Sequence, residues 1–133
     1  MERIVLLLFL VLGFCSQVFA NTPVTTPVAT TVPTQMATSV DCIMSFPIGY
    51  EKLYYLTLAG ANQLNYQIKE MQTKGGFIVF ADNNNKMFLA SIIYVSSTKS
   101  MLKLAPCDNA YNFTISTPTN LFKYIEANQL KTF

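Results

Sequence analysis

Hydrophobic and polar residues follow two different periods along this chain. Between residues 49 and 62, apolar side chains recur every three or four positions, which predicts an amphipathic helix. A short apolar segment at 41–46, stopped by Pro47, predicts a strand before this helix. Later segments either alternate with a period of two or are short and continuously apolar, as strands are. There are five such predicted strands: 64–69, 77–81, 87–95, 99–105 and 111–115.

Turn-forming residues separate these predicted strands. Gly75-Gly76 permits positive φ, Asp82–Lys86 is rich in asparagine, and Ser96–Thr98 is polar. A last helix is expected to begin at Thr117-Pro118, which suits the N-cap and first helical positions. Strands joined by tight turns are antiparallel. The pattern therefore predicts a two-layer α+β domain, in which an antiparallel β-meander of four to five strands is packed by an N-terminal and a C-terminal helix.

The first 20 residues have the order of a secretory signal peptide. A basic residue precedes an apolar run at 4–12, and Val18 and Ala20 occupy the −3 and −1 positions of a cleavage site. A membrane span needs about 20 apolar residues, which is more than this run offers, although an uncleaved N-terminal anchor is the alternative. Cys15 gives a second alternative, lipidation as in bacterial lipoproteins, but the phenylalanine before it is too large for that cleavage site.

The sequence therefore divides into three parts with different compositions. Residues 1–20 are the predicted signal peptide, and residues 21–40 are rich in threonine, proline and valine and carry no charge. Such a segment is typical of an extended linker. Residues 41–133 are the predicted small α+β domain. We expect a secreted or periplasmic protein, with a lipid-anchored form in the cell envelope as the alternative.

One stretch of the predicted domain resembles a known family. A helix that ends in Leu64–Ile68, followed by a turn and Gly76–Phe80, is similar to small envelope domains of the helix-grip kind. The pattern over about residues 45–130 resembles the repeated domains of BamC-type lipoproteins of outer-membrane barrel assembly. The resemblance implies a helix packed on an antiparallel sheet and an accessory or binding role in the envelope. No functional residue of that family maps onto this chain, so the resemblance implies no reaction.

Two cysteines, Cys42 and Cys107, remain after the predicted signal peptide. In an oxidising compartment, an even pair with no other partner usually forms a disulfide, which we therefore predict. The bridge would close a loop of about 65 residues and contribute about 4 kcal/mol in the chain-entropy view. Two buried free thiols are the alternative.

The composition argues against most catalytic chemistry. The chain has no histidine, which removes the usual general base near neutral pH and the commonest ligand of zinc and copper. We therefore expect no enzyme activity, no metal and no cofactor. Asp82–Lys86 lacks the glycine and the terminal glutamate of a calcium loop. Ser96–Lys99 matches the S-x-x-K motif but lies between strands and not on a helix, so both segments are interpreted as turns.

Charge and modification signals are weak. Glu2 and Arg3 offset each other, so the net charge is +2 with or without the predicted signal peptide. This balance gives no field that would favour nucleic acid. Asn112-Phe113-Thr114 is an acceptor sequon for N-linked sugar in a eukaryotic host.

The predicted strand at 87–95 is apolar on both of its faces around Ile92–Val95. Either helices cover both faces of the sheet, or one face meets a partner or ligand. Phe88, Ile92 and Tyr94 share one face and are the predicted binding residues. We expect an exported, non-enzymatic module that binds a protein or an envelope component, close to the membrane if Cys15 carries lipid. A small carrier of apolar ligands or lipid is the alternative.

Overall fold

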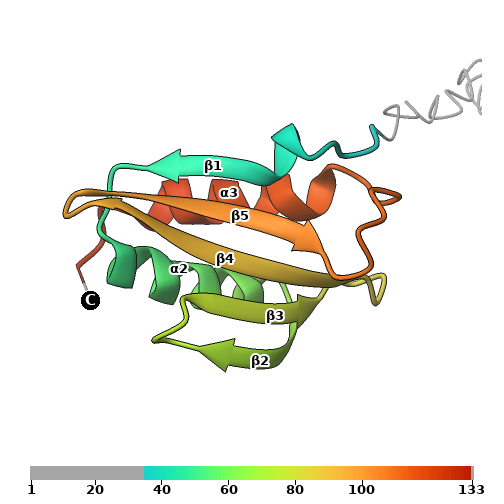
Figure 1. Ribbon diagram of the computed structural model, residues 1–133, viewed down its shortest axis with the longest axis horizontal. Coiled ribbons are helices and arrows are strands. Elements are labelled where there is room, and N and C mark those ends of the chain that lie inside the picture. The colour runs from blue at the N-terminus through green and yellow to red at the C-terminus, as the bar shows by residue number, and fades with distance from the viewer. Residues whose placement is uncertain (1–34, 133) are drawn as a thin grey trace, which may run out of the picture. The chain divides into compact units, whose positions relative to one another are not determined.

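The computed structural model describes residues 35–132 (Figure 1). The predictions of a signal peptide at 1–20, of lipid on Cys15 and of most of the linker lie outside the described residues. The described chain folds into these elements: η1 Val40–Cys42, β1 Ile43–Phe46, α2 Tyr50–Gln63, β2 Gln67–Gln72, β3 Phe77–Ala81, β4 Met87–Ser96, β5 Lys99–Pro106 and α3 Ser116–Asn128.

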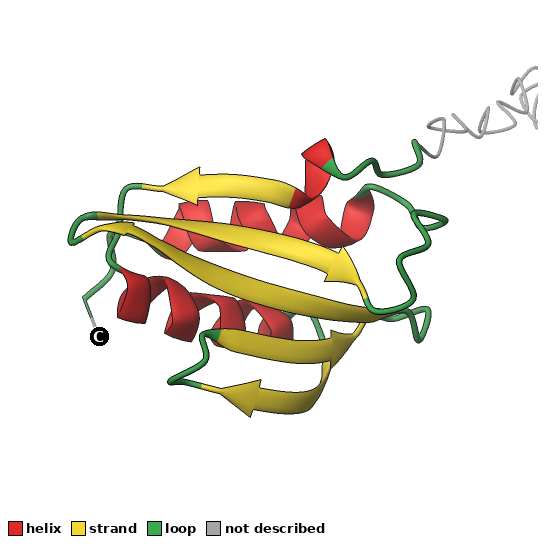
Figure 2. Ribbon diagram, viewed as in Figure 1, coloured by secondary structure: helices red, strands yellow, loops and turns green. Residues whose placement is uncertain are grey.

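The strands form one antiparallel sheet in the order β1-β5-β4-β3-β2. Strands β2 to β5 are consecutive hairpins, whereas β1 pairs with β5, with Ile43 opposite Lys103. Both long helices lie on the same side of this sheet (Figure 2). The predicted α+β class, with helices before and after an antiparallel meander, is therefore confirmed.

The predicted strand at 111–115 is wrong. Strand β5 ends at Pro106, and Asn109 then adopts a left-handed backbone with φ of 57°, which turns the chain away from the sheet. In the described structure, residues 111–115 form only one isolated β-bridge, in which Thr114 pairs with Met36. The backbone N–H of Ala37 also donates to the carbonyl of Phe113 at 3.0 Å. Residues 35–40, which the sequence assigned to the linker, therefore belong to the folded unit.

The boundary between α2 and β2 also differs from the prediction. Asn65 has a φ of 59°, so the chain reverses directly after the helix, and β2 begins at Gln67 instead of Leu64. The backbone N–H of Tyr66 donates to the carbonyl of Ala61 at 2.8 Å, and this turn places the Tyr66 ring in the core.

The core lies between the sheet and the two helices and is rich in aromatic rings. Phe80 stacks on Phe88 with ring centroids 5.5 Å apart, and the ring centroids of Phe46 and Phe122 of α3 are 6.2 Å apart. Helix α2 contributes a fully buried apolar side through residues such as Leu53. Burial of each such side chain stabilises the fold by about 1.5–3 kcal/mol. The two helices pack closely at Gly60, which has no side chain. A Cβ at this position would come within 2.8 Å of Leu121 and Tyr124.

Candidate functional site

The sheet face opposite the helices is partly exposed and largely apolar, and we call it the open face. Its residues alternate with the core residues along each strand. Its apolar members are Ile43, Phe77, Val79, Met87, Leu89, Ile93, Met101 and Ala105. No helix within residues 35–132 covers this face (Figure 1). Within residues 35–132, helices therefore cover only one of the two faces of the sheet.

The predicted binding residues do not lie together on this face. Phe88 and Ile92 are 0% and 6% exposed and point toward the helices, so their assignment to a contact surface is wrong. Tyr94 is 63% exposed because β4 extends beyond the region that the helices cover. The intervening residues Leu89 and Ile93 occupy the open face instead, and Ile93 is 40% exposed.

Strand pairing places two charged residues beside the apolar part of the open face. Glu70 of β2 lies opposite Val79, and Lys103 of β5 lies opposite Ser91. Both side chains are exposed. The open face therefore has an apolar centre, an acidic group on its β2 side and a basic group on its β5 side.

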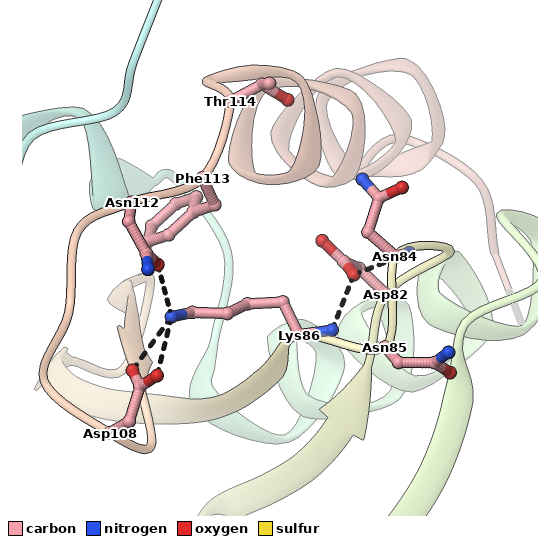
Figure 3. A pocket seen from close by; sticks show the side chains of 8 residues that line it. All are labelled: Asp82, Asn84, Asn85, Lys86, Asp108, Asn112, Phe113 and Thr114. Atoms are coloured by element: carbon pink, nitrogen blue, oxygen red, sulfur yellow. Dashed lines mark hydrogen bonds and ion pairs between the residues drawn. The ribbon is translucent and has the colours of Figure 1, made fainter.

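A polar pocket of about 470 Å³ lies at one end of the sheet, and its walls come from the β3–β4 loop and the segment before α3 (Figure 3). Asp82 is only 5% exposed, and its carboxylate holds the β3–β4 loop in place. Its Oδ1 accepts hydrogen bonds from the backbone N–H groups of Asn84 and Lys86, both at 2.9 Å. Its Oδ2 accepts a hydrogen bond from the hydroxyl of Thr117 at 2.9 Å. This carboxylate therefore ties the loop to the first turn of α3.

Lys86 crosses the pocket from the other side of the same loop (Figure 3). Its ammonium contacts the two carboxylate oxygens of Asp108 at 2.9 and 2.8 Å and the Oδ1 of Asn112 at 2.6 Å. It also lies 5.9 Å from the centre of the Phe113 ring. The hydrogen bond from Lys86 lowers the pKa of Asp108 below its usual value. The pocket therefore contains an ion pair that joins the loop to the 107–115 segment.

The charged side chains of the pocket are all engaged in hydrogen bonds or an ion pair. Asp82 binds the backbone N–H groups of Asn84 and Lys86 and the hydroxyl of Thr117, and the ammonium of Lys86 pairs with the carboxylate of Asp108. A nucleophile with an adjacent general base is not among its lining residues. Over residues 35–132, histidine, cysteine and acidic side chains nowhere gather in threes around a space for a metal ion.

Two motifs in the sequence are turns, as predicted. Asp82–Lys86 is a hairpin turn in which Asn85 has a φ of 61°. Ser96 lies opposite Lys99 across a two-residue turn, so the S-x-x-K segment joins β4 to β5 and is not helical. The sequon residue Asn112 lies in the exposed segment before α3.

Cys42 and Cys107 are free thiols that are not within disulfide distance, so the structure does not contain the predicted bridge. Register explains why. Cys42 directly precedes Ile43, which lies opposite Lys103, whereas Cys107 follows the end of β5 at Pro106, so about three residues of β5, or about 10 Å, separate the two positions along the sheet. Cys42 is buried, and burial raises the pKa of its thiol to about 11; burial also raises the pKa of Cys107.

The helices of the described part of the chain are too short and too polar for a membrane span. Comparison with models of known protein families gives no match for this chain. A search of curated proteins also finds no relative.

Proposed function

We propose that this protein acts outside the cytoplasm as a non-enzymatic binding module, and that its open face contacts a partner protein. The observation that carries the proposal is the apolar surface around Leu89 and Ile93, which no helix within residues 35–132 covers. Apolar surface of this kind, with polar groups at its border, is typical of protein contact sites.

Two features of the sequence support the extracytoplasmic location. The apolar run at 4–12 with Val18 and Ala20 is typical of a cleaved signal peptide. The Thr/Pro-rich composition of residues 21–34 is typical of a spacer, which would let the folded unit reach a partner.

The non-enzymatic part of the proposal is supported by the polar pocket. Lys86 and Asp108 form an ion pair, and Asp82 is held by backbone N–H groups and the Thr117 hydroxyl, which leaves no poised base or nucleophile among the lining residues. The helix-grip description and the resemblance to BamC-type domains are part of this proposal. They are supported by a first helix that packs against an antiparallel sheet.

The experiment combines photocrosslinking with mass spectrometry in the native host. A photoreactive phenylalanine replaces Leu89 or Ile93 on the open face, and Tyr55 on the exposed side of α2 serves as the matched control. We expect one adduct of defined mass at both open-face positions and none at Tyr55. Excess purified protein without the photoreactive group should compete for the partner and reduce the adduct.

The same purified protein tests export through its first residue. A mature chain that begins at Asn21 supports the proposal, whereas an intact chain with Met1 in the cytosol overturns it. Absence of adducts at Leu89 and Ile93, or an equal adduct at Tyr55, would also overturn it. Lipid that copurifies with the protein in a fixed ratio would indicate the carrier function instead.

A further inference from the structure

We infer that the partner of the open face is a second copy of this chain, so that the protein forms a symmetric dimer with the two sheets packed face to face. The inference rests on the proposed function, because it assigns the occupant of the same surface. Three features of the molecule support a second copy as the occupant: the charge pattern of the face, the two edges of the sheet and the available area.

The charges of the open face are complementary to themselves. Glu70 lies on β2 and Lys103 on β5, with the apolar residues of β3 and β4 between them. A rotation of 180° about an axis parallel to the strands, between β3 and β4, places β5 of one copy over β2 of the other. Lys103 of each copy then approaches Glu70 of the second, and the contact occurs twice because such an interface uses the same patch on both copies.

The register allows this approach. Glu70 aligns with Val79, Leu89 and Ala105 across the sheet, and Lys103 lies two residues from Ala105 along β5. The offset along the strand is therefore about 7 Å, and packed sheets are about 10 Å apart. Side chains as long as lysine and glutamate can span this separation. Neither residue forms an ion pair within residues 35–132, so both charges are available to a second copy.

The sheet edges are poorly suited to a dimer, which leaves the face as the available surface. Strand β2 contains an irregular register between Ile68 and Glu70, and Lys69 in this bulge hydrogen-bonds to Gln67. A bulge and charged side chains are features that prevent edge-to-edge pairing. The other edge, β1, has four residues and is followed by Pro47.

The available area predicts a weak dimer. Four strands at about 4.8 Å spacing and about 25 Å long give about 500 Å² per copy, or about 1,000 Å² in total. This area is near the lower limit for specific protein interfaces. We therefore expect a monomer–dimer equilibrium with a dissociation constant in the micromolar range.

Sedimentation equilibrium of the protein, expressed from its full sequence, tests the inference. We expect Leu89→Asp at the centre of the face to weaken dimerisation at least about a hundredfold. Ser91→Lys, on the same face, is a second variant in case the first fails to fold. Tyr55→Asp introduces the same charge on α2 and should leave the equilibrium unchanged. Thermal unfolding verifies that each variant is folded.

Charge reversal tests the proposed arrangement of the two copies. Glu70→Lys or Lys103→Glu alone should weaken the dimer about tenfold, and the double reversal should restore it to within about twofold. The matched control is the double reversal of Lys123 and Glu126, two exposed residues of α3, which should have no effect.

A protein that stays monomeric at several hundred micromolar overturns the inference, as does a double reversal that fails to restore the dimer. A monomer that still gives a Leu89 photoadduct with a different protein overturns the dimer but leaves the proposed function in place. Loss of every adduct overturns both.

Discussion

Replacement of Asp82 should destabilise the fold more than its place in a surface turn suggests. Its carboxylate accepts two backbone hydrogen bonds within the loop and one from Thr117, and the side chain is buried. Asp82→Ala removes all three bonds and leaves the donors without their partner. A hydrogen bond to a charged group contributes about 1.5–3 kcal/mol, but water can enter the adjacent polar pocket. We therefore expect a loss of about 3 kcal/mol in the free energy of unfolding.

The size of this effect can be separated into its parts. Asp82→Asn keeps an acceptor for the two backbone groups and disturbs only the Thr117 contact, so we expect a loss of about 1 kcal/mol. In a domain of this size, 1 kcal/mol corresponds to about 4–8 °C in Tm, so Asp82→Ala should lower Tm by about 15 °C. Asn84→Ala is the control, because only its backbone takes part in the loop. A free energy of unfolding for Asp82→Ala within about 1 kcal/mol of that of the unchanged protein, in thermal or urea unfolding, would contradict a stabilising role of this carboxylate.

Three further predictions concern single side chains. Burial raises the pKa of the Cys42 thiol from 9.0 to about 11, so the fold favours the neutral thiol and stability should fall as pH rises from about 9 toward 11. Cys42→Ala should remove this fall of Tm with pH in thermal scans. Gly76→Ala should lower the free energy of unfolding by more than about 1 kcal/mol in urea, because φ is +66° and the new Cβ would clash with the Tyr50 hydroxyl. Adding Tyr50→Phe removes the clash but not the backbone strain, so it should recover only part of this stability. Lys86→Met should raise the pKa of Asp108 in a carboxylate NMR titration, and an unchanged pKa would contradict the ion pair.

The architecture could be predicted from sequence because it depends on local periodicity. The apolar side of the helix near residues 49–62 and the turn chemistry at Gly76 and Asn85 each specify their element without reference to the rest of the chain. The pairing of β1 with β5 could not be obtained in this way, because no local signal joins Ile43 to Lys103. The disulfide prediction failed for the same reason, since the distance between Cys42 and Cys107 depends on that register.

The contact residues were assigned to the wrong face of β4 because the strand is apolar on both faces around Ile92–Val95, so its pattern does not show which face is buried. Ser96 lies opposite Lys99, and an unbroken hairpin from that turn would place Ile92 opposite Lys103 on the exposed side. The register shifts between Tyr94 and Ser96, so Ile92 instead lies opposite Leu102 in the core. A bulge of this kind has no reliable sequence signal, yet it exchanges the two faces of the strand.

The position of β1 beside the last strand has a consequence for how the molecule assembles. The hairpins from β2 to β5 connect neighbours in the sequence, whereas residues 43 and 103 must close a loop of about 60 residues before β1 can pair. We therefore expect the four hairpin strands to form first and the N-terminal strand to dock late, on an edge that stays vacant until then. During that interval the edge of β5 can accept a matching strand from another chain, which makes exchange of the N-terminal segment the characteristic misfolding risk of this topology.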